Sequence, residues 1–295
     1  MDAMQYGLRP LDFGNPRPRR VGLTRRGFLT SSVAGGFALA AGPAAATTIT
    51  TDTEGLVAGE VMIPVDDGEI PAYRAMPAEG EGFPLLLVVQ EIFGVHEHIR
   101  DVCRRYAKRG YCAIAPAMFV RQGDVSKMAD IDTILSEVVA RVPDAQVMRD
   151  LDATVAHAGG LASVDATRLG IIGFCWGGRT VWLYAHHNPS VKAGVAYYGL
   201  VDGMQSDIKP RDPVDVAAAL SVPVLGLYAG ADAYIQRDAL RAMRTELLKS
   251  DSGSHIVVFP GVDHGFNADY RPTYDEAAAD YARKLAGDWL RERGV

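Results

Sequence analysis

The chain has 295 residues, of which 48% are hydrophobic and 22% are charged, and its formal net charge is −6. This composition is typical of a globular protein and argues against disorder, a collagen repeat or a coiled coil. Residues 1–46 carry more arginine than aspartate, so residues 47–295 are more acidic than the whole chain. The negative charge of residues 47–295 repels phosphate backbones, so nucleic acid is not expected as a partner.

The N-terminal region is typical of an export signal. The segment TRRGFLT at 24–30 is followed by a mildly apolar run and by small residues that end in an A-x-A site at Ala46. This resembles a twin-arginine signal peptide, and the alternative is a basic tail that stays on the chain. We expect the twin-arginine machinery to export the protein to the periplasm or the medium, with residues 1–46 removed and 47–295 forming one domain. No later stretch approaches about 18 apolar residues, so no membrane span is expected after cleavage.

A hairpin, a buried strand and an amphipathic helix are the first predicted elements of this domain. Residues 59–77 alternate in hydrophobicity around an Asp-Asp-Gly turn, as the two strands of a hairpin do. The apolar run 83–90 predicts a strand buried on both faces. The apolar spacing in 96–110 predicts a helix that ends at Gly110, and 111–116 predicts the next strand.

Strands and helices alternate through the rest of the chain. From residue 124 to 158 the pattern is helical, with a break at Pro143. The later predicted strands are 168–174, 191–199, 222–230 and 255–261, and the later predicted helices are 177–187, 237–250 and 273–293. This alternation favours the α/β class, with a mostly parallel sheet and helices on both faces.

Ligands of such sheets bind beyond the carboxyl ends of the strands, so the residues that follow each strand are candidate site residues. The chemistry-bearing residues at these positions are Glu91, Phe119, Arg121, Cys175, Asp232, Asp263 and His264. They include a thiol, a carboxylate and an imidazole in the chain order nucleophile, acid, base. An α/β-hydrolase uses these groups in this order, here with cysteine in place of serine.

The segment GFCWGGR at 173–179 predicts a tight turn between a strand and a helix. Gly173 and Gly177 supply positions without side chains, which a strained turn of this kind needs. The turn would raise Cys175 above the sheet at a helix N-terminus, where a thiolate is stabilised. It would also aim the N–H of Trp176 at a developing oxyanion. The alternative is a buried thiol in a glycine-rich turn.

His264 stands out among the histidines because it follows a strand late in the chain. A catalytic histidine needs a carboxylate that holds its tautomer and stabilises the imidazolium. Asp232 lies in a loop after a strand and is preferred for this role, although aspartate is also a common turn or capping residue. Asp263 is the rival, but the side chains of adjacent residues diverge.

The other two cysteines, Cys103 and Cys112, fall in a predicted helix and a predicted strand. Both are expected to be buried hydrophobic residues. No Cys/His spacing of a zinc site is present, so a metal site is not expected.

Several motifs together resemble the dienelactone hydrolase family, from about Val61 to the C-terminus. They are QEIFGVHEHIRDVCRRYAKRGYCAIAPAMFVRQGD (90–124), GFCWGG, YYG, AGADAYI and DHGF. The resemblance implies the α/β-hydrolase fold and a catalytic triad of Cys175, His264 and Asp232.

The resemblance also implies roles for residues around the triad. Glu91 corresponds to a carboxylate that interacts with the resting thiol and helps to activate it when substrate binds. A partly desolvated carboxylate with a raised pKa is compatible with that role, and a surface salt bridge is the alternative. Ile92 corresponds to the second oxyanion-hole N–H, beside that of Trp176. Phe93 and Phe119, from the same long motif, are the expected apolar substrate contacts.

The arginines depart from the family pattern. Arg121 matches the arginine that binds the substrate carboxylate, with a solvated loop arginine as the alternative. The family has a second arginine four residues after the catalytic histidine, where this chain has Ala268. Arg271 is a candidate replacement. This departure concerns the choice of substrate and leaves the chemistry unchanged.

The expected function is hydrolysis of a lactone or small activated ester through a thioester on Cys175, with no cofactor. A broader carboxylesterase or thioesterase with the same triad is the nearest alternative. A ligand-binding homologue without catalysis and an oxidant-sensing thiol protein are the others. The exact substrate, the pathway and the oligomeric state do not follow from the sequence.

Overall fold

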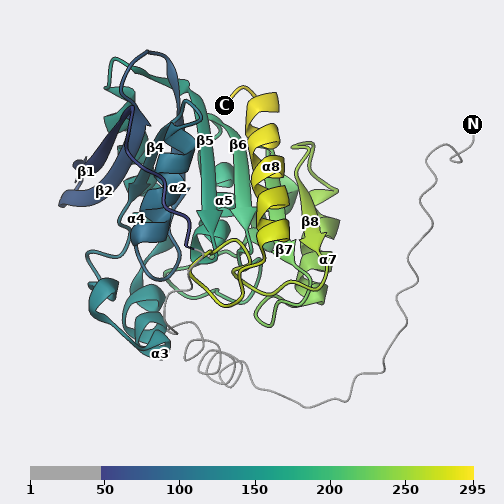
Figure 1. The fold of residues 1–295 in the computed structure, drawn as a ribbon. Helices are drawn as coiled ribbons and strands as arrows, with labels where there is room; N and C mark the ends of the chain where they lie inside the picture. The colour runs from purple at the N-terminus through teal and green to yellow at the C-terminus, as the bar shows by residue number, and fades with distance from the viewer. Residues whose placement is uncertain (1–47) are drawn as a thin grey trace, which may run out of the picture.

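A computed structural model describes residues 48–295, so the expected signal peptide and its cleavage site after Ala46 lie outside the described residues. This part of the chain forms an eight-stranded sheet in the order β1-β2-β4-β3-β5-β6-β7-β8 (Figure 1). The strands are β1 Leu56–Val65, β2 Gly68–Pro77, β3 Phe83–Val89, β4 Cys112–Pro116, β5 Val164–Phe174, β6 Val191–Tyr197, β7 Val224–Ala229 and β8 His255–Phe259. The α/β-hydrolase expectation is confirmed.

The sheet is antiparallel at one edge and parallel elsewhere. β1 and β2 form the predicted hairpin, with Val65 opposite Gly68, and β2 pairs antiparallel with β4. All pairs from β4 to β8 are parallel. In β3, Leu85 to Val89 are fully buried, which confirms a strand covered on both faces.

Helices cover both faces of the sheet. The longer ones are α2 Glu97–Ala107, α4 Asp144–Gly159, α5 Trp176–His187, α7 Arg237–Leu247 and α8 Glu276–Glu292. In Figure 1, α2 and α8 lie in front of the sheet and α5 lies behind it. A short helix, α6 Pro213–Val216, and the turn η4 Ala217–Ala219 fill the β6–β7 connection.

The segment predicted to be helical from 124 to 158 is continuous only in α4, which begins directly after Pro143. Before it the chain makes short turns: η1 Val125–Lys127, α3 Ile131–Thr133, η2 Ile134–Val138 and η3 Val139–Arg141. The side chains of Asp124 and Asp130 accept the backbone N–H groups of Ser126 and Thr133. These local bonds start separate turns and compete with one continuous helix.

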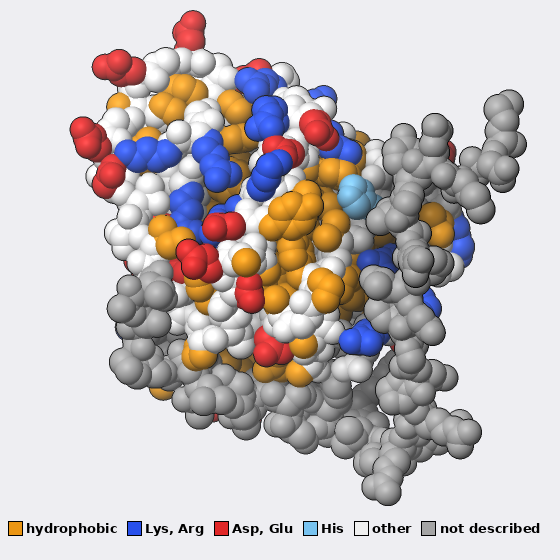
Figure 2. Space-filling view, turned by 45° about the vertical axis from the view of Figure 1, so that its right-hand side comes forward, with side chains coloured by type: hydrophobic (Ala, Val, Ile, Leu, Met, Phe, Trp, Pro, Cys, Tyr) orange, Lys and Arg blue, Asp and Glu red, His pale blue; other side chains and the backbone are white. Residues whose placement is uncertain are grey.

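Two surface features bear on partners. Among residues 48–295, no helix combines the length and apolarity needed to cross a bilayer. On the face shown in Figure 2, acidic and basic side chains are interspersed, with hydrophobic side chains between them. Most of the basic side chains gather in the upper half of that face (Figure 2), with acidic side chains among and around them.

Candidate active site

Cys175 lies in the turn between β5 and α5 with φ 53° and ψ −113°, a backbone conformation that is strained for a residue with a side chain. Two backbone hydrogen bonds hold it there. The Cys175 N–H donates to the Tyr197 carbonyl (3.0 Å), and the Arg179 N–H donates to the Cys175 carbonyl (3.2 Å). The side chain remains partly exposed. The predicted strand-to-helix turn is therefore present.

The glycines around Cys175 are required by close backbone contacts. A Cβ on Gly173 would lie 2.2 Å from the Gly177 carbonyl oxygen, and one on Gly177 would lie 2.3 Å from the Val89 carbonyl oxygen. A Cβ on Gly178 would lie 2.4 Å from the Tyr197 carbonyl oxygen. The turn can thus pack against β3 and β6 only without these side chains.

The structure brings His264 and Asp232 together, from loops after β8 and β7. Their Nδ1 and Oδ2 atoms are 2.8 Å apart, and both side chains are buried. The Asp232 Oδ1 accepts the backbone N–H groups of Tyr234 (2.8 Å) and Ile235 (3.1 Å), which fixes the carboxylate. Asp263, the rival orienter, is exposed.

The environment of His264 favours its protonated form. Burial lowers the pKa of His264. The Asp232 carboxylate and the Cys175 sulfur, each of which also hydrogen-bonds to the ring, outweigh burial and raise this pKa to about 10. The rings of Tyr198 and Tyr234 stand edge-on to the imidazole, with centroids 5.0 and 5.1 Å away. An imidazolium beside the thiol is the arrangement that activates a cysteine nucleophile.

Glu91, directly after β3, is fully buried and belongs to a charged network. The Tyr270 hydroxyl donates to its Oε2 at 2.6 Å, and the His96 Nε2 lies 3.6 Å from the same oxygen. Arg271 Nε donates to the Tyr270 hydroxyl at 3.2 Å. Burial raises the pKa of Glu91, but the Arg271 cation and the two nearby histidines prevail and hold this pKa well below its usual range. The raised pKa considered from the sequence is therefore wrong for this arrangement.

The other oxygen of Glu91, Oε1, is buried without a hydrogen-bond partner among the described residues. Glu91 is therefore ionised, and one of its carboxylate oxygens accepts no hydrogen bond from the described residues. Tyr270 was not among the residues singled out in the sequence. The available signal was its position, six residues after His264 in a loop that already carried the candidate Arg271.

Arg121, Ala268 and Arg271, the three positions considered for binding a substrate carboxylate, have different surroundings in the structure. Arg121 makes bidentate contacts with Asp67 (2.6 and 2.7 Å) and with Asp150 (2.8 and 3.1 Å), so its guanidinium is already satisfied. Ala268 is fully buried. Arg271 instead stacks over Phe93, with 5.0 Å from its Cζ to the ring centroid, and the hydrogen bond found for it among the described residues comes from Nε alone. The expectation that Arg121 binds substrate disagrees with this geometry, because two carboxylates occupy its donors.

The two expected oxyanion donors lie at the same edge of the sheet. Trp176 is the first residue of α5, and N–H groups in a first helical turn have no acceptor within the helix. Ile92 lies in the turn after β3, which the Gly94 N–H closes by donating to the Glu91 carbonyl (3.4 Å). Phe119 packs edge-on against the Trp176 ring, with centroids 4.8 Å apart.

Two further features of residues 48–295 are the other two cysteines and the lack of a side-chain cluster that could hold a metal ion. Cys103 and Cys112 are fully buried, as expected, and burial raises the pKa of Cys112 to about 11. All three cysteines are free thiols. The described residues contain no group of three or more His, Cys, Asp or Glu side chains arranged to hold a metal ion.

The family model described as the dienelactone hydrolase family matches residues 70–294. The chain belongs to this family. It is 58% identical over 274 residues to a Methylorubrum extorquens protein named "Putative carboxymethylenebutenolidase", covering 92% of this chain and 94% of that protein. An Escherichia coli K12 protein of the same name is 48% identical over 260 residues, covering 88% and 96%.

A solved structure from Klebsiella pneumoniae, described as "Putative Dienelactone Hydrolase", is similar over 80% of this chain and 99% of that one. The TM-score is 0.78 and the identity 49%. A dienelactone hydrolase-like phosphotriesterase from metagenomic libraries has a TM-score of 0.66 at 19% identity, a likeness that concerns the fold alone. The chain is thus a hydrolase with an α/β-hydrolase fold.

Proposed function

We propose that the protein hydrolyses a lactone or small activated carboxylic ester through a covalent thioester on Cys175. The observation that carries the proposal is the partly exposed Cys175 on a strained turn, beside an imidazole that Asp232 holds at 2.8 Å. A buried structural cysteine needs neither the strained backbone nor the coupled histidine.

In the proposed mechanism the Cys175 thiolate attacks the ester carbonyl, and the N–H groups of Trp176 and Ile92 stabilise the oxyanion. The C–O bond then breaks, the alkoxide or enolate leaves with a proton from His264, and a thioester remains. His264, oriented by Asp232, removes a proton from water, whose hydroxide adds to the thioester. The carbon–sulfur bond breaks, which releases the acid and restores the thiolate. An enolate leaves readily, which suits a soft sulfur nucleophile.

The nearest alternative, a broader esterase or thioesterase, uses the same triad. A panel of enol lactones, p-nitrophenyl esters and acyl thioesters separates the two. The proposal expects the highest kcat/KM for an enol lactone or an ester with an equally good leaving group. A kcat/KM that is as high for acyl thioesters or for simple alkyl esters would favour the broader enzyme.

In His264→Gln the rate at which Cys175 reacts with iodoacetamide at neutral pH is expected to fall by roughly tenfold or more. The reason is that His264, with its pKa raised to about 10, stays protonated below that pH and keeps its positive charge beside the sulfur. The rate is measured by mass spectrometry of the Cys175 peptide. His255→Gln, at an exposed histidine that begins β8, is the matched control and should behave as the wild type. An unchanged rate in His264→Gln would contradict the pairing.

We further propose that Arg271 binds a carboxylate on the substrate, because Arg121 is committed to Asp67 and Asp150. Phenyl hydrogen succinate and phenyl butanoate differ mainly in that carboxylate. Arg271→Met is expected to lower the preference for the anionic ester, measured as its kcat/KM divided by that of the neutral ester, by about 10- to 100-fold. This factor corresponds to the free energy of one charge-assisted hydrogen bond.

Arg121→Met is the matched control for this prediction. It should leave the ratio unchanged and lower the free energy of unfolding by on the order of 1–3 kcal/mol, because the buried Asp150 loses its partner. If Arg121→Met removes the preference for the anionic ester and Arg271→Met does not, the assignment is reversed.

A further inference from the structure

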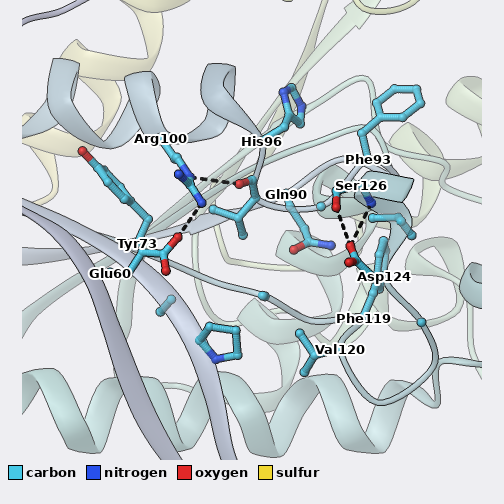
Figure 3. A pocket seen from close by; sticks show the side chains of 17 residues that line it. Glu60, Tyr73, Gln90, Phe93, His96, Arg100, Phe119, Val120, Asp124 and Ser126 are labelled. Carbon is cyan, nitrogen blue, oxygen red and sulfur yellow. Dashed lines mark hydrogen bonds and ion pairs between the residues drawn. The ribbon is translucent and has the colours of Figure 1, made fainter. Parts of the chain in front are cut away.

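A cavity of about 450 Å³ lies beside the candidate active site, on the β4 and β2 side of β3. Its walls come from residues 71–73 of β2, residues 90–96 between β3 and α2, and residues 117–126 after β4. In Figure 3, Tyr73 and Glu60 stand on one side of it, Phe119 and Asp124 on the other, and Gln90 between them. No part of the proposed mechanism uses this space.

Three side chains form the boundary between the cavity and the catalytic groups. Phe93 lies under the Arg271 guanidinium, and Phe119 lies against Trp176 next to the nucleophile. His96 lies 3.6 Å from Glu91. All three also line the cavity, whereas Cys175, Asp232 and His264 do not. The cavity therefore adjoins the reacting groups without being lined by the triad residues.

The chemistry of the walls favours an uncharged occupant. The charged groups in the wall already have partners: Arg100 pairs with Glu60 at 2.6 Å, and Asp124 pairs with Lys127 at 2.8 Å. Between these pairs the lining is aromatic and aliphatic, with Phe119 and Val125 almost fully buried. An additional charge in this space would lose water without gaining a counter-ion.

Gln90 adds a polar group to this apolar lining. Its side-chain oxygen accepts the Met118 N–H at 3.3 Å, which fixes the orientation of the amide because only the oxygen can accept that bond. Its Nε2 is then left buried with no hydrogen-bond partner among the described residues. A buried unpaired donor costs about 1–3 kcal/mol, and an oxygen acceptor on a bound molecule would recover part of that.

We propose that this cavity binds an uncharged aryl or alkyl arm of the substrate, carrying an oxygen acceptor within reach of Gln90. This inference rests on the proposed ester hydrolysis at Cys175. Cavities of roughly 300–1,000 Å³ hold drug-sized ligands, so this one exceeds what a small lactone needs. The substrate class is accordingly an activated ester or lactone with an extended apolar arm.

The test compares phenyl acetate with two extended esters that carry an ether oxygen in the arm, phenyl 4-phenoxybutanoate on the acyl side and 4-phenoxyphenyl acetate on the alcohol side. At least one extended ester is expected to have a kcat/KM about tenfold or more above that of phenyl acetate. The reason is that burying a few additional carbon atoms in an apolar pocket raises kcat/KM by about this factor. Val120→Trp, which adds bulk to a partly exposed cavity residue, should remove that advantage and leave phenyl acetate unchanged. Leu248→Trp, at an exposed residue that does not line the cavity, is the matched control and should change nothing.

The inference is overturned if neither extended ester exceeds phenyl acetate, or if the advantage survives Val120→Trp. The proposed function fails in a different way, when no ester is turned over in a Cys175-dependent manner. Calorimetry then still tests the cavity through the product probes 4-phenoxyphenol and 4-phenoxybutanoate, added to Cys175→Ala with and without Val120→Trp. Binding that Val120→Trp abolishes supports the cavity assignment, and no binding of either probe contradicts it.

Discussion

Cys175→Ala is expected to lower kcat/KM for phenyl acetate by at least about 10⁴-fold. The nucleophile forms the covalent intermediate, so its loss removes the reaction path, and only the residual effect of the oxyanion donors and of binding remains. The fold should survive, because the change removes one partly exposed sulfur from a turn whose backbone bonds involve Tyr197 and Arg179. Steady-state hydrolysis and thermal unfolding of both proteins measure the two effects.

Cys112→Ala is the matched thiol control for this variant. Cys112 is fully buried at the start of β4, away from the carboxyl edge of the sheet, so its removal costs packing and no chemistry. We expect kcat/KM within about threefold of the wild type. If Cys175→Ala kept more than about a tenth of the wild-type activity in a folded protein, another residue would have to be the nucleophile.

Asp232→Asn is expected to lower kcat by about 10⁴-fold at neutral pH. The amide keeps the size of the carboxylate, but it no longer stabilises the imidazolium, and it can favour the wrong tautomer of His264. The carboxylate charge is the largest of the influences that raise the pKa of His264, so this pKa should also fall in the variant. Proton NMR of the His264 ring follows that shift independently of turnover.

The adjacent carboxylate provides the control for Asp232→Asn. Asp263 is exposed, and the His264 ring nitrogen bonds to Asp232. Asp263→Asn should keep kcat within about twofold of the wild type, since surface charges contribute little. A large loss in Asp263→Asn with little change in Asp232→Asn would exchange the two assignments.

The fold was predictable because its signals are local. The apolar run of β3, the alternation of β1 and β2 and the glycines around Cys175 each dictate a conformation within a few residues. The pair of Asp232 and His264 was accessible as well, since strand order in a parallel sheet brings loops at the carboxyl edge together.

The surroundings of the triad depend on contacts between distant segments, which no local pattern encodes. Arg271 lies far from Glu91 in the sequence, and its charge, together with two nearby histidines, outweighs burial and holds the pKa of the glutamate low. Arg121 follows a strand as a binding residue would, but Asp67 and Asp150 reach it from the hairpin turn and from α4. The position of a residue directly after a strand therefore indicates where the residue lies in the fold, but it does not show which other side chains the residue contacts.

The central claim is that Cys175 carries the acyl group of the substrate. Intact-mass spectrometry of the purified protein, stopped within seconds of exposure to an enol-lactone and activated-ester panel, tests it most directly, beside Cys175→Ala. We expect an added mass equal to the acyl group of the substrate on the wild type, which decays as hydrolysis proceeds and is absent from the variant. Turnover in the wild type with no adduct under any quench, or the same adduct on Cys175→Ala, would contradict it.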